Sequence, residues 1–292
     1  MAGCSGSSAR SVVVYTSQDQ VYSEPILRRF TEQTGIEVRA VYDNEAVKTV
    51  GLANRLLAER GYPQCDIWWS NEELRTRQLN NLGVFRETDA WRAVGFRSRR
   101  MVINTNHLPR ASAPTRLSEL TDSRWRGKIA LAYPLFGTTA AHFLALRQSW
   151  GEARWTEWCR ALQSNKPLLV DGNSVVVRLV GKGEAWLGLT DSDDIAAGRR
   201  EGLPIESMPV TDETLLIPNT VGVIRNPPHA EAAQKLFEYL QQSEVLDRLV
   251  KANALEGRTS TETGTATLKP DWGELVRDLE LATTRLKEIF LR

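Results

Sequence analysis

Short apolar runs alternate along this chain with longer segments whose apolar residues recur every three or four positions. The first run, residues 12–15, is the β-branched sequence Val-Val-Val-Tyr, which is typical of a buried parallel strand. Residues 23–34 follow with helical periodicity, and Gly35 ends that helix. Residues 36–40 and 66–69 are the next strand-like runs. This order predicts an α/β fold with a mostly parallel sheet and right-handed crossovers.

The alternation restarts near residue 105. Further strands are expected at 128–133, 167–170, 186–189, 215–217 and 221–224, and further helices at 46–60, 71–82, 137–146, 152–163, 174–182, 228–240 and 272–291. We therefore expect two lobes joined by a hinge, with the ligand cleft between them, since ligand sites prefer such interfaces. The expected division is a flexible N-terminal tether at 1–10, lobe one at 11–104 plus 216–292, and lobe two at 105–215.

An acidic loop directly follows the apolar run 187–189. Thr190 and Ser192 lie among three carboxylates there: Asp191, Asp193 and Asp194. Acidic side chains at the carboxyl end of a strand occupy the place where open α/β sheets bind ligands. Asp and Ser are also good helix caps, so a solvated capping cluster is the alternative interpretation. Three carboxylates exceed what a cap needs, which favours a ligand site.

Composition narrows the class of protein further. The 292 residues carry a formal net charge of +1, which gives no argument for binding nucleic acid. No apolar run approaches the ~20 residues that span a bilayer. The three cysteines cannot all pair with one another; Cys65 and Cys159 have apolar neighbours and are expected to be buried. Cys4 lies in a Ser/Gly tract and is a candidate for lipidation, a terminal thiol without a role being the alternative.

Two predicted helices in the second lobe begin with residues suited to anion binding. These residues are Gly137, Thr138 and Thr139 in one helix and Asn173 and Ser174 in the other. Free backbone N–H groups and the helix dipole favour negative charge at such ends, although Thr is also an ordinary cap. Arg97 or Arg99 could add a bidentate guanidinium. Both belong to the basic run 97–100, which as a charge run is also consistent with a solvated face.

Several motifs together resemble the ferric-ion-type periplasmic substrate-binding proteins of ABC importers, a group that includes binders of phosphonates and sugar phosphates. They lie at residues 13–17, 30–38, 65–69, 97–99, 125–130, 173–174, 183–184 and 228–240. The resemblance implies a type II periplasmic-binding fold that closes around a ligand. It also implies a monomer in the periplasm or another extracytoplasmic location, lipid-anchored if Cys4 is acylated, that delivers its ligand to a membrane permease.

The chain departs from the ferric binders at the positions of their ligands. Their two adjacent tyrosines correspond to Ser192 and Asp193, and Asn71 stands where they often have a Glu. The remaining loop, with Ser17 and Asp19, is also expected to face the cleft. The loss of both phenolates argues against tight Fe(III) binding. Carboxylate and amide oxygens suit Ca²⁺ or Mg²⁺ at least as well. The expected metal ligands are Asp19, Asp191 and Asp193.

The expected function is capture of a small ligand for an importer, with no obligatory cofactor. The ligand is a metal ion with a companion anion, by resemblance to the iron binders, or a small phosphonate, phosphate ester or other zwitterion. A hydrolase or transferase acting on a small phosphorylated molecule is the rival class. Against that class, His107, His142 and His229 show neither metal-ligand spacing nor a nucleophile partner, and no phosphate-binding glycine loop occurs.

Overall fold

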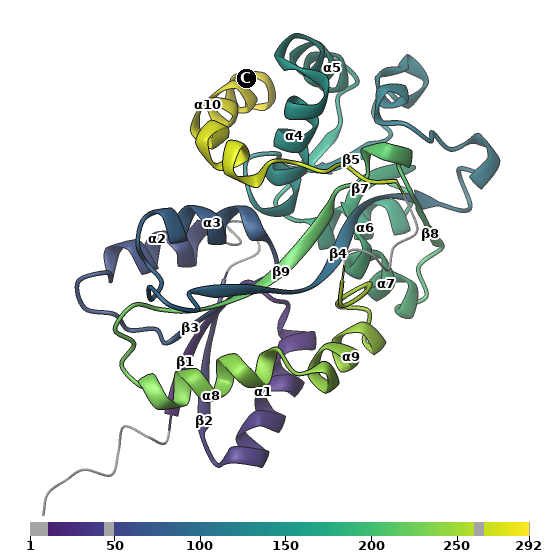
Figure 1. Cartoon of the computed structure of the whole chain (residues 1–292). Coiled ribbons are helices and arrows are strands. Elements are labelled where there is room, and N and C mark those ends of the chain that lie inside the picture. The colour runs from purple at the N-terminus through teal and green to yellow at the C-terminus, as the bar shows by residue number, and fades with distance from the viewer. Residues whose placement is uncertain (1–10, 44–49, 260–265, 292) are drawn as a thin grey trace, which may run out of the picture. The chain divides into compact units, whose positions relative to one another are not determined.

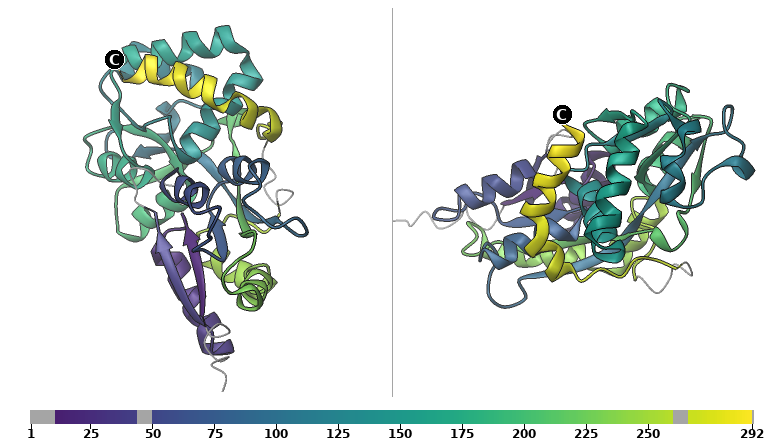
Figure 2. Two further views of the ribbon diagram at one scale, coloured as in Figure 1. Left: turned by 90° about the vertical axis from the view of Figure 1, so that its left-hand side faces the viewer. Right: turned by 90° about the horizontal axis from the view of Figure 1, so that it is seen from above.

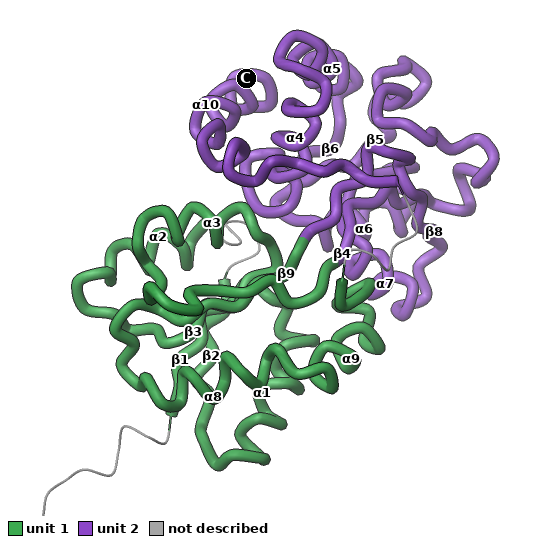
Figure 3. Tube along the Cα trace, in the orientation of Figure 1, with its two compact units in different colours: residues 1–96, 218–260 green, residues 97–217, 261–292 purple. Residues whose placement is uncertain are grey.

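The computed structural model describes residues 11–43, 50–259 and 266–291. The chain forms two compact units, each built from more than one stretch of sequence (Figure 3). Unit 1 comprises Met1–Phe96 and Pro218–Ser260, and unit 2 comprises Arg97–Ile217 and Thr261–Arg292. Residues 1–10, with the predicted tether and Cys4, lie outside the described residues.

Unit 1 is built around a sheet in the order β2-β1-β3-β9 (Figure 1). The strands are β1 (Ser11–Thr16), β2 (Glu37–Tyr42), β3 (Ile67–Ser70) and the latter part of β9 (Leu216–Val223). β1 pairs in parallel with both β2 and β3, whereas β9 pairs with β3 in antiparallel fashion. The carboxyl ends of β1 and β3 therefore lie at the same edge of the sheet, where polar residues follow both strands.

Helices cover both faces of the unit 1 sheet. They are α1 (Gln20–Thr34), α2 (Val50–Ala58), α3 (Glu73–Asn81), α8 (Ala230–Leu240) and α9 (Ser243–Lys251). Alternate residues of β1 point to opposite faces, so Val12 and Val14 pack with α1, α8 and α9, while Tyr15 packs with α2 and α3. α1 ends where Gly35 adopts a left-handed conformation and its N–H bonds the carbonyl of Thr31.

Unit 2 is built around β4 (Trp91–Asn104), whose first residues belong to unit 1. The other strands are β5 (Ile129–Ala132), β6 (Leu168–Val170), β7 (Leu187–Asp191) and β8 (Ile205–Met208). β4 pairs with β7 and β8 in antiparallel fashion, and β5 pairs in parallel with β6 and β7. Every side chain of β5 and β7 is buried, as expected of strands covered on both faces.

The helices of unit 2 are α4 (Gly137–Trp150), α5 (Glu152–Ser164), α6 (Asn173–Gly181), α7 (Ser192–Arg200) and α10 (Trp272–Phe290). Short 3-10 turns lie at Arg110–Ser112, Leu117–Thr121, Ser123–Trp125 and Thr211–Glu213. α6 and α7 pack against Val102 of β4 and Ala130 of β5. α10 packs against α4 and α5, as Figures 1 and 2 show.

The placement of α10 corrects the expected domain division, which put residues 216–292 in lobe one. α10 buries one stripe of side chains, Leu275, Leu279, Ala282, Leu286 and Phe290. Phe290 meets Phe143 of α4 with ring centroids 6.0 Å apart, and Asp278 pairs with Arg147 of α4. The apolar face of α4 and α5 is thus completed by a helix from the far end of the chain, which no local pattern reveals.

The predicted α/β fold is confirmed, and most predicted helices and strands are present. The helix α9 and the strands β4 and β8 were not predicted, and β9 was predicted as two shorter strands, 215–217 and 221–224. Cys65 and Cys159 are buried and free, as predicted. In the described part of the chain, no helix combines the length and apolarity that crossing a membrane requires.

The packing of α10 on unit 2 can be tested by truncating single leucines. Leu286 is 0% exposed, so Leu286→Ala should lower the free energy of unfolding by about 2–5 kcal/mol through lost burial and a cavity. Leu281 lies on the same helix but is 64% exposed, and Leu281→Ala should change it by less than about 0.5 kcal/mol. Urea denaturation of both variants checks this; equal effects would contradict the packing.

Candidate functional site

Two arginines and two aspartates meet inside unit 2 because β4 and β7 are neighbours. Arg99 pairs in register with Asp191, the last residue of β7. Arg97 lies two residues earlier on β4 and therefore points to the same face as Arg99. Asp193 lies in the first turn of α7, directly after β7. The antiparallel ladder thus sets the four charged side chains opposite one another.

These four side chains form a buried ion-pair network. Arg97 Nη2 lies 3.0 Å from Asp191 Oδ2, and Arg97 Nη1 bonds Asp193 Oδ2. Arg99 Nη1 lies 2.6 Å from Asp191 Oδ1. All four residues are at most 3% exposed. Burial alone raises the pKa of Asp191, but the charges of Arg97 and Arg99 and hydrogen bonds from Arg99 and Thr138 outweigh it, so the pKa is lowered.

Neutral side chains from α4 and α6 complete the surroundings of Asp191. Thr138 Oγ1 donates to Asp191 Oδ2 at 2.8 Å, and Asn173 Nδ2 donates to the same oxygen at 3.2 Å. Arg99 Nη1 in turn donates to Asn173 Oδ1 at 3.0 Å. The Asp191 carboxylate therefore lies at the starts of two helices and beside two guanidiniums.

Both helices begin without a side-chain cap. The residue before α4 is Phe136 and the residue before α6 is Gly172, and neither caps its helix. The first backbone N–H groups of a helix have no partner within it, and they carry the positive end of its dipole. Gly137, with φ of 53°, makes the turn into α4. Two helix starts of this kind beside Arg99 provide the donors that an anionic group requires.

The remaining predicted residues of the second lobe lie around this network. Thr139 Oγ1 donates to Asn173 Oδ1 at 3.4 Å, and Thr190 Oγ1 donates to the Asn173 carbonyl at 3.2 Å. Ser192 Oγ accepts from the Ser98 N–H at 3.3 Å. Asp194 is in the first turn of α7, and Ser174 is in the first turn of α6. The residues predicted from the acidic loop and the helix starts are therefore brought together within unit 2.

The acidic loop does not act as a simple capping cluster. Asp191 is the N-cap residue of α7, yet its side chain makes no capping hydrogen bond. Its carboxylate instead faces Arg97 and Arg99. The solvated-face interpretation of the run 97–100 is also wrong for these two arginines, which are buried.

His142 lies close to Arg99 in the structure, a proximity that the sequence did not indicate. His142 lies one turn after Thr138 on α4 and is 0% exposed, with Nε2 hydrogen-bonded to the Glu213 carbonyl at 2.8 Å. Burial, and then the nearby charge of Arg99, lower its pKa to about 3, so the ring is neutral. His142 Nδ1 and Arg99 Nε and Nη2 are buried without a hydrogen-bond partner among the described residues. The i, i+2 spacing of Arg97 and Arg99 was the signal for a shared strand face.

Two of the three predicted residues of the first lobe, Ser17 and Asn71, form a cluster of uncharged groups in unit 1. Ser17 Oγ donates to Asn71 Oδ1 at 3.1 Å and accepts from the Asn71 N–H at 3.0 Å. Gln18 and Ser70, which were not predicted as ligand residues, join it through a 3.3 Å bond from Gln18 Nε2 to the Ser70 carbonyl. Asp19 is the N-cap residue of α1 and makes no capping bond. The cluster occupies the shared edge of β1 and β3 and offers hydroxyl and amide groups.

The predicted metal ligands fit a cation poorly in this arrangement. Ligand oxygens of Asp191, Asp193 and Asp194 lie within 4.8 Å of one another, close enough to share an ion. Two of these carboxylates, however, are ion-paired with Arg97 and Arg99, whose positive charges oppose a metal ion. Asp19, the third predicted ligand, belongs to unit 1.

Removing the charge of Asp191 should destabilise the protein. Asp191→Asn leaves two buried guanidiniums without their shared counter-charge, so the free energy of unfolding should fall by about 3–5 kcal/mol. Asp212→Asn removes an exposed carboxylate paired with Arg116 and should cost less than about 1 kcal/mol. Denaturant unfolding measures both. Similar small losses would show that the network contributes little.

The neutral state of buried His142 should appear in the pH dependence of stability. Its pKa of about 3 lies below the unfolded value of about 6.5, so the unfolded chain binds more protons between these values. The stability that the neutral His142 ring contributes is complete above pH 6.5 and is lost as the pH falls towards 3. Between pH 6.5 and 4.5, the free energy of unfolding of wild type should fall by up to ~1.4 kcal/mol per pH unit relative to that of His142→Asn. Urea titrations of both proteins measure this difference; parallel curves would contradict the assignment.

Comparison with solved structures shows the same fold at low sequence identity. Iron-bound HitA from Pseudomonas aeruginosa superposes with a TM-score of 0.80 at 17% identity, covering 96% of this chain and 99% of that one. AfuA from Actinobacillus pleuropneumoniae with fructose-6-phosphate superposes with a TM-score of 0.83 at 18% identity. This match covers 96% of this chain and 98% of that one. Apo ferric ion-binding protein A from Pasteurella haemolytica superposes with a TM-score of 0.81 at 18% identity, covering 96% of this chain and 98% of that one. These likenesses establish the two-lobed periplasmic-binding fold.

Sequence comparison adds one curated relative and a family. An uncharacterised protein of Haemophilus influenzae is 25% identical over 219 residues, a match that spans 67% of this chain and 62% of the relative's length. The family of bacterial extracellular solute-binding proteins matches residues 11–252, most of the chain. The expected family resemblance is therefore confirmed, and this chain belongs to the bacterial extracellular solute-binding proteins.

Proposed function

We propose that this chain is the extracytoplasmic solute-binding component of an ABC importer, and that its solute carries a phosphate, phosphonate or carboxylate group. The anionic group binds unit 2 at the starts of α4 and α6, beside Arg99. The observation that carries this proposal is the pairing of Asp191 and Asp193 with Arg97 and Arg99 at two helix starts without side-chain caps.

The balance of charge favours an anion over a cation. Two buried guanidiniums and two buried carboxylates cancel formally. The starts of α4, α6 and α7 each add about half a positive charge, since each helix directs unsatisfied N–H groups outward. Asp194, partly exposed, opposes this with one negative charge. Thr138 and Asn173 supply neutral hydrogen-bonding groups in the same place. An anion gains from all three helix ends, whereas a cation would face both arginines.

A metal ion with a companion anion is the second candidate. It is supported by the three carboxylates whose oxygens lie within 4.8 Å of one another, and by the resemblance to iron-binding proteins. The same fold also carries fructose-6-phosphate in AfuA, so the fold by itself does not choose between the ligands. Ser192 and Asp193 replace the two tyrosines of the ferric binders, which weighs against Fe(III).

The proposal includes delivery to a membrane permease, a periplasmic or other extracytoplasmic location and a monomeric state. Family membership supports the permease and the location. A binding protein rather than an enzyme is favoured because the groups around Asp191 are engaged with one another. The Thr138 hydroxyl donates to a carboxylate, and the buried His142 donates to a backbone carbonyl. Neither arrangement presents an activated nucleophile with its base.

Calorimetric titration can separate the two candidate ligands. The probes are fructose 6-phosphate, 2-aminoethylphosphonate, Fe(III)-citrate and Ca²⁺, with wild type, Asp193→Asn and Thr138→Ala. For an anionic solute, Asp193→Asn should keep or raise the affinity, because it removes a negative charge. Thr138→Ala should weaken binding by about 1 kcal/mol, or roughly fivefold, because it removes the hydrogen bond that holds the Asp191 carboxylate beside the two helix starts.

Thr115→Ala is the control for Thr138→Ala, because Thr115 is an exposed threonine of the same unit. It should leave binding unchanged. A metal ion as the solute would give the opposite pattern for Asp193→Asn, a loss of more than about tenfold, since the variant removes a ligand. That result, with phosphates failing to bind wild type, would replace the anion by the metal ion.

A further inference from the structure

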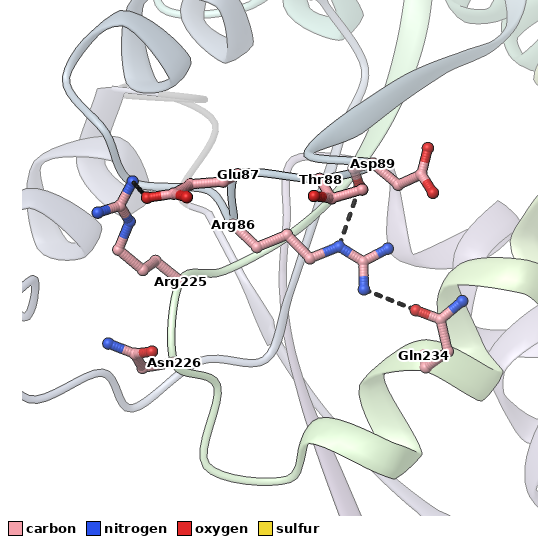
Figure 4. A pocket seen from close by; sticks show the side chains of 7 residues that line it. All are labelled: Arg86, Glu87, Thr88, Asp89, Arg225, Asn226 and Gln234. Carbon is pink, nitrogen blue, oxygen red and sulfur yellow. Dashed lines mark hydrogen bonds and ion pairs between the residues drawn. The ribbon is translucent and has the colours of Figure 1, made fainter.

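A pocket of about 520 Å³ opens on unit 1, and it is lined by none of the candidate-site residues (Figure 4). Its lining comes from the loop before β4, from the segment that follows β9 and from α8: Arg86, Glu87, Thr88, Asp89, Arg225, Asn226 and Gln234. The volume lies within the usual range of small-molecule sites, roughly 300–1,000 Å³. All of these residues belong to unit 1.

Arg86 is held in this pocket by uncharged groups on three sides. Its Nε donates to the Asp89 carbonyl at 3.1 Å, and Nη1 donates to Gln234 Oε1 at 2.6 Å. Its guanidinium lies over the Phe237 ring, 5.1 Å from the centroid. Figure 4 shows the guanidinium between the 86–89 loop and Gln234. Arg86 is thus oriented before any ligand binds, which reduces the entropy lost on binding.

The two carboxylates of the pocket are directed to other arginines. Asp89 pairs with Arg92, which lies outside the pocket lining. Glu87, 83% exposed at its side chain, lies 3.4 Å from Arg225. Among the described residues, no carboxylate lies within ion-pair distance of Arg86. The positive charge of Arg86 is therefore not balanced by a carboxylate, and it can interact with an incoming anion.

We propose that this pocket is a second anion site, which takes a small molecule bearing a phosphate or carboxylate group. A guanidinium has five N–H donors, and Arg86 uses two of them, so three remain for bidentate recognition of an oxyanion. Thr88 and Asn226 add neutral polar groups to the lining. Arg225 contributes a second positive charge, only weakly offset by the exposed Glu87.

This site is independent of the proposed solute site, because it shares no residue with unit 2. The two can therefore be separated by mutation. NMR titration with inorganic phosphate at constant ionic strength, following the Arg86 Nε–H signal, reports on the pocket directly. Thr138→Ala should leave that titration unchanged, whatever happens to solute binding.

Arg86→Gln should weaken phosphate binding by at least tenfold. The backbone amide signals of Thr88 and Asn226 report this affinity, because the variant lacks the Arg86 Nε–H signal. Arg86→Lys should weaken it less, since a lysine keeps the charge but loses the bidentate geometry. Lys235→Gln is the matched control: it removes one positive charge from an exposed residue beside Gln234 on α8 and should have no effect. Urea unfolding of each variant checks that the fold is kept. Arg225→Gln changes an exposed residue, so it should weaken phosphate binding without destabilising the fold.

The proposal is overturned if wild-type amides around the pocket do not shift with phosphate, or if Arg86→Gln and Lys235→Gln weaken binding equally. Equal effects would mean that phosphate responds only to overall charge. Repeating the titration with acetate tells which oxyanion the site prefers: saturation by phosphate alone indicates a phosphate ester, and saturation by both indicates an oxyanion site that also accepts carboxylates.

Discussion

The buried Asp191 carboxylate, shared by Arg97 and Arg99, is the constraint on which the rest of unit 2 depends. Removing three such charges from water costs several kcal/mol for each, and only close, well-oriented pairing offsets that cost. β4 must hold both arginines on one face, and β7 must end at Asp191. α4 and α6 must begin where Thr138 and Asn173 reach the same oxygen. A small error in any of these elements would leave a buried charge unpaired.

The same constraint bears on what the proposed site would bind. Because Asp191 and Asp193 already have cationic partners, the groups left to attract a solute there are the backbone N–H groups of the helix starts. Helix dipoles act over the first turn only, so in the proposed binding mode the charged group of the solute lies close to Gly137 and Asn173. In unit 1 the corresponding strand ends carry Ser17 and Asn71, which suit hydroxyl or amide groups better than a charge.

The fold was largely predictable because alternating strands and helices leave a strong local pattern. The misplaced elements are those whose pattern is not local. The apolar face of α10 could pack against any apolar surface, and its sequence does not say which one. Only the structure shows that it packs against α4 and α5. β9 contains Pro218-Asn219-Thr220 between its apolar ends, which divided it into two predicted strands. In β4, four arginines, two of them buried in ion pairs, concealed the strand.

The sequence was enough to predict which residues form the candidate site. It was not enough to predict which of them pair with one another. Strand ends and helix starts identified Thr138, Asn173 and Asp191 without any knowledge of their partners. Pairing depends on which strands are neighbours, and the antiparallel contact of β4 with β7 has no signature in either segment alone.

The partners of an arginine indicate its role more reliably than its burial does. Arg97 and Arg99 are fully buried, yet their charges are matched by carboxylates from the same unit, so their first role is to hold β4 and β7 in register. Arg86 is only partly buried, but a carbonyl, an amide and a ring hold it, and none of these neutralises it. In the proposed second site an anion would supply the counter-charge, and little further ordering would be needed because the guanidinium is already in place.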